Sequence, residues 1–124
     1  MPIITVSYEK GQFTGDGQAL LHGVREALTE AFSLPPDDVF TLLWVYEPEY
    51  VRFPKGQETS ILVEVSCFSG RSAEQKERFF QLAARAVTDV GGDAEHMLAV
   101  VHDIPMENWG VWGGQSAKKA FAPK

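Results

Sequence analysis

The fold is decided by residues 61–102, which run ILVEVSCFSGRSAEQKERFFQLAARAVTDVGGDAEHMLAVVH. The β-branched and aromatic side chains from Ile61 to Phe68 predict a strand, and a turn follows at Ser69-Gly70-Arg71. Ser72 has Gln75 three residues later, which is a capping-box spacing, so a helix is expected from there to Gly91-Gly92. A strand over residues 97–102 completes a βαβ unit, whose two strands are expected to be parallel.

The same order of elements occurs earlier in the chain. Residues 3–8 predict a strand, and apolar residues at helical spacing from Ala19 to Phe32 predict a helix with Thr14 or Asp16 as its N-cap. Pro35-Pro36 ends this helix, and residues 39–46 predict a second strand. The two units are offset by about 58 residues, because Ile3 matches Ile61 and Val39 matches Met97. We therefore predict the α+β class, with two consecutive βαβ units forming one four-stranded sheet and both helices on one face.

The chain is expected to form a single domain over residues 1–124. Its parts are a first unit over about 2–46, a second over about 60–103, and a C-terminal hairpin and polar tail over 104–124. The strands around residues 41–45 and 98–101 carry apolar side chains on each side, so the helix-free face of the sheet needs a cover. Because no further helix is available, neighbouring copies of the chain are the expected cover.

Composition narrows the possible partners. The 124 residues carry a formal charge of -6, with a pI near 5.0, which gives no basic excess for a nucleic acid. No apolar run is long enough to span a membrane, and the first residues lack the order of a secretory signal. Cys67 is the single cysteine, so no internal disulfide can form. The expected location is the cytoplasm.

Three stretches resemble the tautomerase superfamily, whose members assemble βαβ units into trimers or hexamers and use an amino-terminal proline as the catalytic group. They are Met1-Pro2-Ile3-Ile4, Gly70-Arg71-Ser72-Ala73-Glu74-Gln75-Lys76, and residues 104–114. The last two are similar to 4-oxalocrotonate tautomerase. The chain length and Phe32-Ser33-Leu34-Pro35-Pro36-Asp37-Asp38 are similar to the malonate semialdehyde decarboxylase branch.

Pro2 is the candidate catalytic residue. Removal of Met1 would leave a secondary amine whose pKa starts near ~8 and is lowered by desolvation or a nearby cation. Such an amine can take a proton from carbon and return it. If Met1 is retained, the nitrogen of Pro2 is an amide without useful basicity. A proline in second position can also have no function.

Arg71 and Asp38 are the other candidate catalytic residues. The resemblance implies that Arg71 binds the substrate carboxylate, which suits a guanidinium fixed in a turn. Its alternative is an ion pair with Glu74 or Glu77. Asp38 matches the aspartate of the decarboxylase branch, where its charge would favour a protonated amine. Its alternative is a simple turn residue.

The resemblance also implies a pocket. Trp109 matches the aromatic residue that shapes it, and with Phe40 and Arg71 it forms the expected substrate-binding set; packing at an interface is the alternative for Trp109. The second arginine of the decarboxylase branch is replaced by Ser69, and that of 4-oxalocrotonate tautomerase by approximately Phe40 and Leu98. Arg52 could supply a second cation from an adjacent subunit. No cofactor is expected, and no metal, because the histidines lack ligand spacing.

The leading hypothesis is a cofactor-independent tautomerase of a small 2-oxo carboxylic acid, expected as a homotrimer. Two alternatives stay open. One is a decarboxylase or hydratase related to malonate semialdehyde decarboxylase, with a cationic Pro2 and with Asp38 orienting water. The other is a trimeric scaffold or binding protein without catalytic activity.

Overall fold

One mixed sheet of four strands organises the computed structural model, which describes residues 1–123. The strands are β1 (Ile3–Glu9), β2 (Phe40–Tyr46), β3 (Leu62–Phe68) and β4 (Leu98–Ile104), in the spatial order β2-β1-β3-β4. β1 pairs with β2 and β3 with β4 in parallel, whereas β1 and β3 are antiparallel. Two βαβ units therefore meet at the centre of the sheet about an approximate twofold axis, and the predicted α+β architecture is confirmed.

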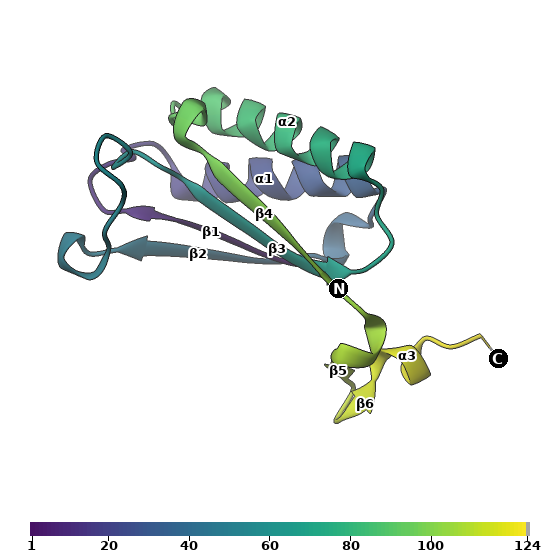
Figure 1. Ribbon diagram of the computed structural model, residues 1–124. Helices are drawn as coiled ribbons and strands as arrows, with labels where there is room; N and C mark the ends of the chain where they lie inside the picture. Colours follow the sequence, from purple (N-terminus) through teal and green to yellow (C-terminus); the bar gives the residue numbers. More distant parts are fainter. Residues whose placement is uncertain (124) are drawn as a thin grey trace.

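Two helices cover the same face of this sheet (Figure 1). They are α1 (Gly17–Phe32) and α2 (Ala73–Asp89). Asp16 caps α1 through its side chain, which settles the choice between Thr14 and Asp16, and Ser72 forms the predicted capping box with Gln75. The end of α2 is also as predicted, because Gly91 takes a positive φ of 82° and donates its N–H to the Thr88 carbonyl.

The core lies between the helices and the sheet. Apolar positions at alternate residues of β1 and β3 face the inner sides of α1 and α2, and the largest fully buried side chains are Phe79, Ile4, Leu20, Leu28, Ile61, Val6, Val24, Val63, Val65 and Val87. The two helices approach closely at Gly23, where an added Cβ would lie 3.0 Å from the Cβ of Ala86. This packing fixes the sheet and so fixes the relative positions of the strand ends.

The helix-free face of the sheet is apolar and open in the single chain. Large side chains of β2 and β4 alternate outward there, and those that remain exposed include Phe40, Leu42, Trp44, Leu98 and Val100. The single chain therefore exposes an apolar surface on this face, which agrees with the expectation that the face needs a cover.

The C-terminal segment differs from the polar tail predicted over residues 115–124. β5 (Gly110–Val111) pairs with β6 (Gln115–Ser116), and a short helix α3 (Ala117–Ala120) follows. Ala117 is fully buried, and Phe121 packs its ring against Trp112 and Phe68. These apolar contacts order the segment, which projects from the sheet as a small arm (Figure 1).

The match between β1 and β3 in the structure differs by one residue from the match that the sequence predicted. Ile3 corresponds to Leu62 rather than to Ile61, whereas Phe40 corresponds to Leu98. The reason is visible in the backbone, because the carbonyls that accept the N–H groups of Phe40 and Leu98 belong to Pro2 and Ile61.

Within residues 1–123, no helix combines the length and the apolar character that crossing a membrane requires.

Candidate active site

The amino terminus is held at the edge of the sheet by two polar contacts. The terminal ammonium of Met1 donates to Oδ2 of Asp38 at 2.8 Å. Pro2 is buried, and its carbonyl accepts the N–H of Phe40 at 2.9 Å. Asp38 ends the short 3₁₀ helix η1 (Pro36–Asp38) immediately before β2, so the parallel pairing of β1 and β2 brings Asp38 to the start of the chain.

A cavity of about 220 Å³ opens beside this terminus. Its walls come from the start of β1, the start of β2 and the C-terminal arm, and are Met1, Ile3, Phe40, Trp109, Gly110, Val111 and Trp112. A second hollow of about 170 Å³ shares Met1 and Phe40 and adds Asp37, Asp38 and Val39. The terminus therefore lies between an apolar aromatic wall and a carboxylate.

Trp109 is held firmly in the aromatic wall. Its indole N–H donates to the Ile104 carbonyl at 3.1 Å, and its ring meets Phe68 edge-on at a centroid distance of 5.2 Å. The polar atom of the side chain is thus satisfied, and the rest of the ring supplies apolar surface. Both roles expected for Trp109, pocket wall and packing residue, are compatible with this position.

Arg71 lies in the turn between β3 and α2, with its guanidinium 5.2 Å from the centre of the Phe32 ring. It forms no ion pair within residues 1–123, so the alternative pairing with Glu74 or Glu77 is not observed there. Its charge is therefore not neutralised by a carboxylate of this part of the chain. Arg71 does not line either of the two hollows around Met1.

The charges of Arg71 and of the amino terminus both act on the thiol of Cys67. Burial raises the pKa of the Cys67 thiol and Asp103 adds to that effect, whereas Arg71, Lys76 and the terminal ammonium act in the opposite direction. Arg71 and the amino terminus thus lie within electrostatic range of one thiol. The antiparallel register agrees, since Ile3 is paired with Ser66 and the next positions outward are Pro2 and Cys67.

The structure places the predicted residues in three groups. Pro2, Asp38, Phe40 and Trp109 lie around the terminus, and Arg71 lies at the same end of the sheet. Within one chain Arg52 lies apart from them, because it lines a separate cavity beside the starts of β3 and β4, and its contribution to the site of an adjacent subunit stays a prediction. Sequence reasoning missed Trp112, which lines the hollow beside Met1 with a positive φ of 47°. The glycines that follow it were the only signal of an unusual turn.

Comparisons with known proteins identify a family and a shared fold. A family model described as "Tautomerase enzyme" matches residues 43–111. The 2-hydroxymuconate tautomerase of Comamonas testosteroni is 37% identical over 57 residues, which are 45% of this chain and 89% of that protein.

Solved structures match over nearly the whole chain. The Q0 fused 4-OT wild type symmetric trimer has a TM-score of 0.81 and 26% identity, covering 96% of this chain and 98% of that one. Malonate semialdehyde decarboxylase has a TM-score of 0.73 and 20% identity over 94% of each chain, which shows a shared fold. With more than half of its length matched by the family model, this chain belongs to the tautomerase enzyme family.

Proposed function

We propose that the chain is a cofactor-independent tautomerase of a small 2-oxo carboxylic acid and that Pro2, freed by removal of Met1, carries the proton. One observation carries the proposal: the chain begins inside an apolar hollow formed with Phe40 and the aromatic arm. A secondary amine at that place would be partly desolvated, which lowers its pKa toward neutrality. An amine of that kind is matched to proton abstraction beside a carbonyl near neutral pH.

The other residues take roles that follow from their positions. The guanidinium of Arg71 would bind the substrate carboxylate, since it has no protein carboxylate partner within residues 1–123. Trp109 and Phe40 would exclude water from the reacting carbon. From the keto form, the amine would remove a proton from the carbon beside the carbonyl and return it to the carbonyl oxygen. From the enol, it would take the hydroxyl proton and return it to that carbon, so that the number of protons is conserved in both directions.

A homotrimer would cover the open face of the sheet. Phe40, Leu42 and Trp44 of β2 expose about half of their surface, and the fused 4-OT relative is described as a trimer. Burial of these side chains against neighbouring copies would remove a large apolar surface from water. The expected mass in solution is three times the 13.7 kDa of the chain.

The experiment starts with intact mass, because only loss of Met1 frees the amine. The kcat/KM for phenylenolpyruvate is then compared between the native chain and Pro2→Ala, which should lose at least about a hundredfold. A matched control inserts one lysine between Met1 and Pro2, so that the initiator methionine is retained and Pro2 stays an amide. If either variant turns over substrate at the native rate while the trimer persists, Pro2 is not the catalyst.

One observation favours a second candidate. The carboxylate of Asp38 lies 2.8 Å from the ammonium of Met1, so it would lie close to the Pro2 amine after Met1 is removed, and a neighbouring anion raises the pKa of an amine. A Pro2 that stayed protonated would suit a hydratase or decarboxylase of a small acid, with Asp38 orienting water. The pH–rate profile separates the two, because tautomerisation requires the deprotonated amine and the hydratase route requires the protonated one. A chain that keeps Met1 in its native cell would instead be a scaffold without catalytic activity.

A further inference from the structure

The approximate twofold axis generates a counterpart of the amino-terminal site at the other end of the sheet. The N–H of Phe40 donates to the Pro2 carbonyl at 2.9 Å, and the N–H of Leu98 donates to the Ile61 carbonyl at 3.0 Å. A 3₁₀ helix precedes each of these donors, η1 before β2 and η3 (Ala94–His96) before β4. The backbone around Ile61 therefore repeats the backbone around Pro2.

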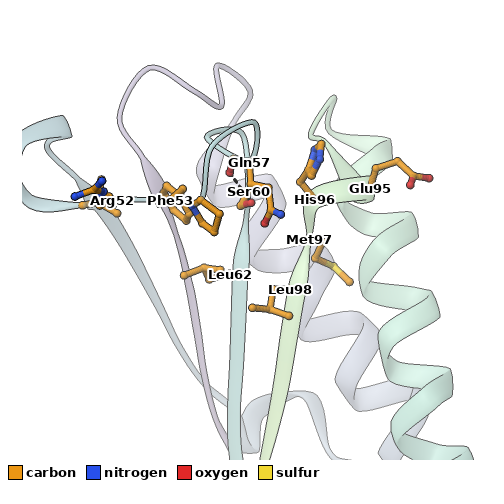
Figure 2. A pocket seen from close by; sticks show the side chains of 11 residues that line it. Arg52, Phe53, Gln57, Ser60, Leu62, Glu95, His96, Met97 and Leu98 are labelled. Atoms are coloured by element: carbon orange, nitrogen blue, oxygen red, sulfur yellow. Dashed lines mark hydrogen bonds between the residues drawn. The ribbon is translucent and has the colours of Figure 1, made fainter.

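A cavity of about 420 Å³ lies at this second place (Figure 2). Two segments of its walls repeat segments of the first site with an offset of 58. Glu95, His96, Met97 and Leu98 stand where Asp37, Asp38, Val39 and Phe40 stand, and Val51, Arg52, Phe53 and Pro54 stand where Trp109, Gly110, Val111 and Trp112 stand. The volume is within the range of small-ligand pockets, about 300 to 1,000 Å³.

The chemistry of the second cavity differs at the catalytic position. Ile61 is fully buried in mid-chain and offers no amine where Pro2 stands in the first site. Ser60 cannot replace it readily, because its hydroxyl already donates to the Gln57 carbonyl at 2.6 Å. The second cavity therefore holds no group equivalent to the catalytic proline.

The position of the positive charge also differs. Gly15 precedes the N-cap of α1 as Arg71 precedes the N-cap of α2. A side chain cannot fit there, since a Cβ on Gly15 would lie 2.5 Å from the Val90 carbonyl oxygen. Arg52 supplies a guanidinium instead, from the opposite wall, where the first site has Gly110. Arg52 thus lines the second cavity, whereas Arg71 lies at the same end of the sheet as the first hollow without lining it.

Neighbouring charges leave Arg52 available. It makes no ion pair with any residue from 1 to 123. Glu95 is the acidic residue of the wall, and its carboxylate points away from the other labelled side chains (Figure 2). His96 is engaged through Nδ1 with Asp93 at 2.5 Å, and Thr59 donates to the same carboxylate at 2.6 Å. Arg52 is therefore the charged group best placed to receive an anion.

We propose that this second cavity binds a small monocarboxylate with an apolar body and does not convert it. Phe53, Leu62, Met97 and Leu98 would contact the apolar part, and Arg52 would bind the carboxylate. Walls that are mostly apolar with one charged anchor are the usual composition of such sites. The proposal does not depend on the chemistry assigned to Pro2.

The test is a titration of the full-length, ¹⁵N-labelled protein with 3-phenylpropionate, followed by the backbone amide resonances. We expect shifts at Gln57, Leu62 and Leu98, and about tenfold or greater weakening at these amides in Arg52→Gln, because a charge-assisted hydrogen bond is lost. Arg85→Gln removes the same charge from an exposed site on α2 and should leave the dissociation constant unchanged. The neutral 3-phenylpropionamide should bind as weakly as the carboxylate binds to the Arg52 variant.

Three outcomes would overturn the proposal. The first is the absence of shifts at Leu62 and Leu98 in the native protein, and the second is an unchanged dissociation constant in Arg52→Gln. The third is that Arg52→Gln weakens binding at Phe40 and Gly110 instead, which would assign Arg52 to the amino-terminal site. Turnover of phenylenolpyruvate is measured on the same samples, so failure of the proposed function is recognised separately from failure of this one.

Discussion

Substitution of Arg71 by glutamine removes the charge that we assign to the substrate carboxylate. The guanidinium lies 5.2 Å from the Phe32 ring centre and has no ion pair within residues 1–123. No nearby protein anion would be left unpaired by the change, so the loss should fall on the substrate. Charge-assisted hydrogen bonds to a carboxylate contribute about 2 to 3 kcal/mol. The expected loss in kcat/KM is therefore about 30- to 150-fold.

The assay is steady-state turnover of phenylenolpyruvate near neutral pH. Most of the loss should appear as a higher KM, because the carboxylate is bound in both the ground state and the transition state. Arg71→Lys keeps the charge but not the planar fork, so its loss should be smaller. Arg78→Gln is the matched control on α2, the helix that follows the Arg71 turn, since Arg78 pairs with Glu30 at 3.1 Å on the exposed surface. It should leave kcat/KM unchanged.

Stability must be followed in parallel, because Arg71 also packs on Phe32. Loss of this cation–π contact should lower the free energy of unfolding by about 0.5 to 1 kcal/mol, which leaves the fold intact. A value of kcat/KM for Arg71→Gln within about twofold of the native value, with the assembly preserved, would refute the assignment; a twofold change is only about 0.4 kcal/mol.

Three further changes test the fold by urea unfolding at a fixed protein concentration. Gly15→Ala should lower the free energy of unfolding by about 1 to 3 kcal/mol, because its Cβ would lie 2.5 Å from the Val90 carbonyl oxygen; an unchanged midpoint would contradict this close packing. Ser72→Ala should cost about 1 kcal/mol through loss of the capping box, and a neutral result would mean that the cap is unimportant. Hydrogen bonds from Thr59 and His96 lower the pKa of Asp93 to about 2 from its ordinary 3.8, so its carboxylate stabilises the fold above pH 3.8 and this contribution is lost as the pH falls toward 2. Asp93→Asn should therefore be less stable than the native protein at pH 6 and should approach it at pH 2; a constant difference would argue against the lowered pKa.

The fold was predictable because its signals are local. Runs of β-branched, aromatic and other apolar residues predicted the strands, the capping box at Ser72 predicted the start of α2, and Gly91-Gly92 predicted its end. The bounds shifted by one or two residues, as in β4, which begins at Leu98 rather than Met97. The antiparallel pairing of β1 with β3 is a contact between the two units, and no local signal in the sequence predicted it.

The site was predictable only in part, because its residues meet through contacts that sequence spacing does not encode. The resemblance predicted Pro2, Arg71, Asp38 and Trp109 as site residues, but the ion pair of the terminal ammonium with Asp38 depends on the register of β1 against β2. The ordering of the C-terminal arm escaped prediction for a similar reason. Residues 115–121 are polar or small for the most part, and Phe121 gains its partners Trp112 and Phe68 only when the chain folds back.

The difference between the two cavities has a simple physical origin in the proposed mechanism. A βαβ unit can form the walls of a hollow wherever its first strand begins, and this chain has two such places, at Pro2 and at Ile61. A secondary α-amine, in contrast, exists only at the end of a chain, and a chain of two units has one amino terminus. Ile61, in mid-chain, has only an amide nitrogen, so no substitution of its side chain alone could restore the amine. The residues around Ile61 therefore need not keep the geometry that proton transfer requires. A cation such as Arg52 can then occupy a position that is glycine in the first cavity. On this reasoning, Ile61→Pro should add no tautomerase activity even if it folds, and a faster turnover by that variant combined with Pro2→Ala than by Pro2→Ala alone would show that a proline with only an amide nitrogen can support the reaction.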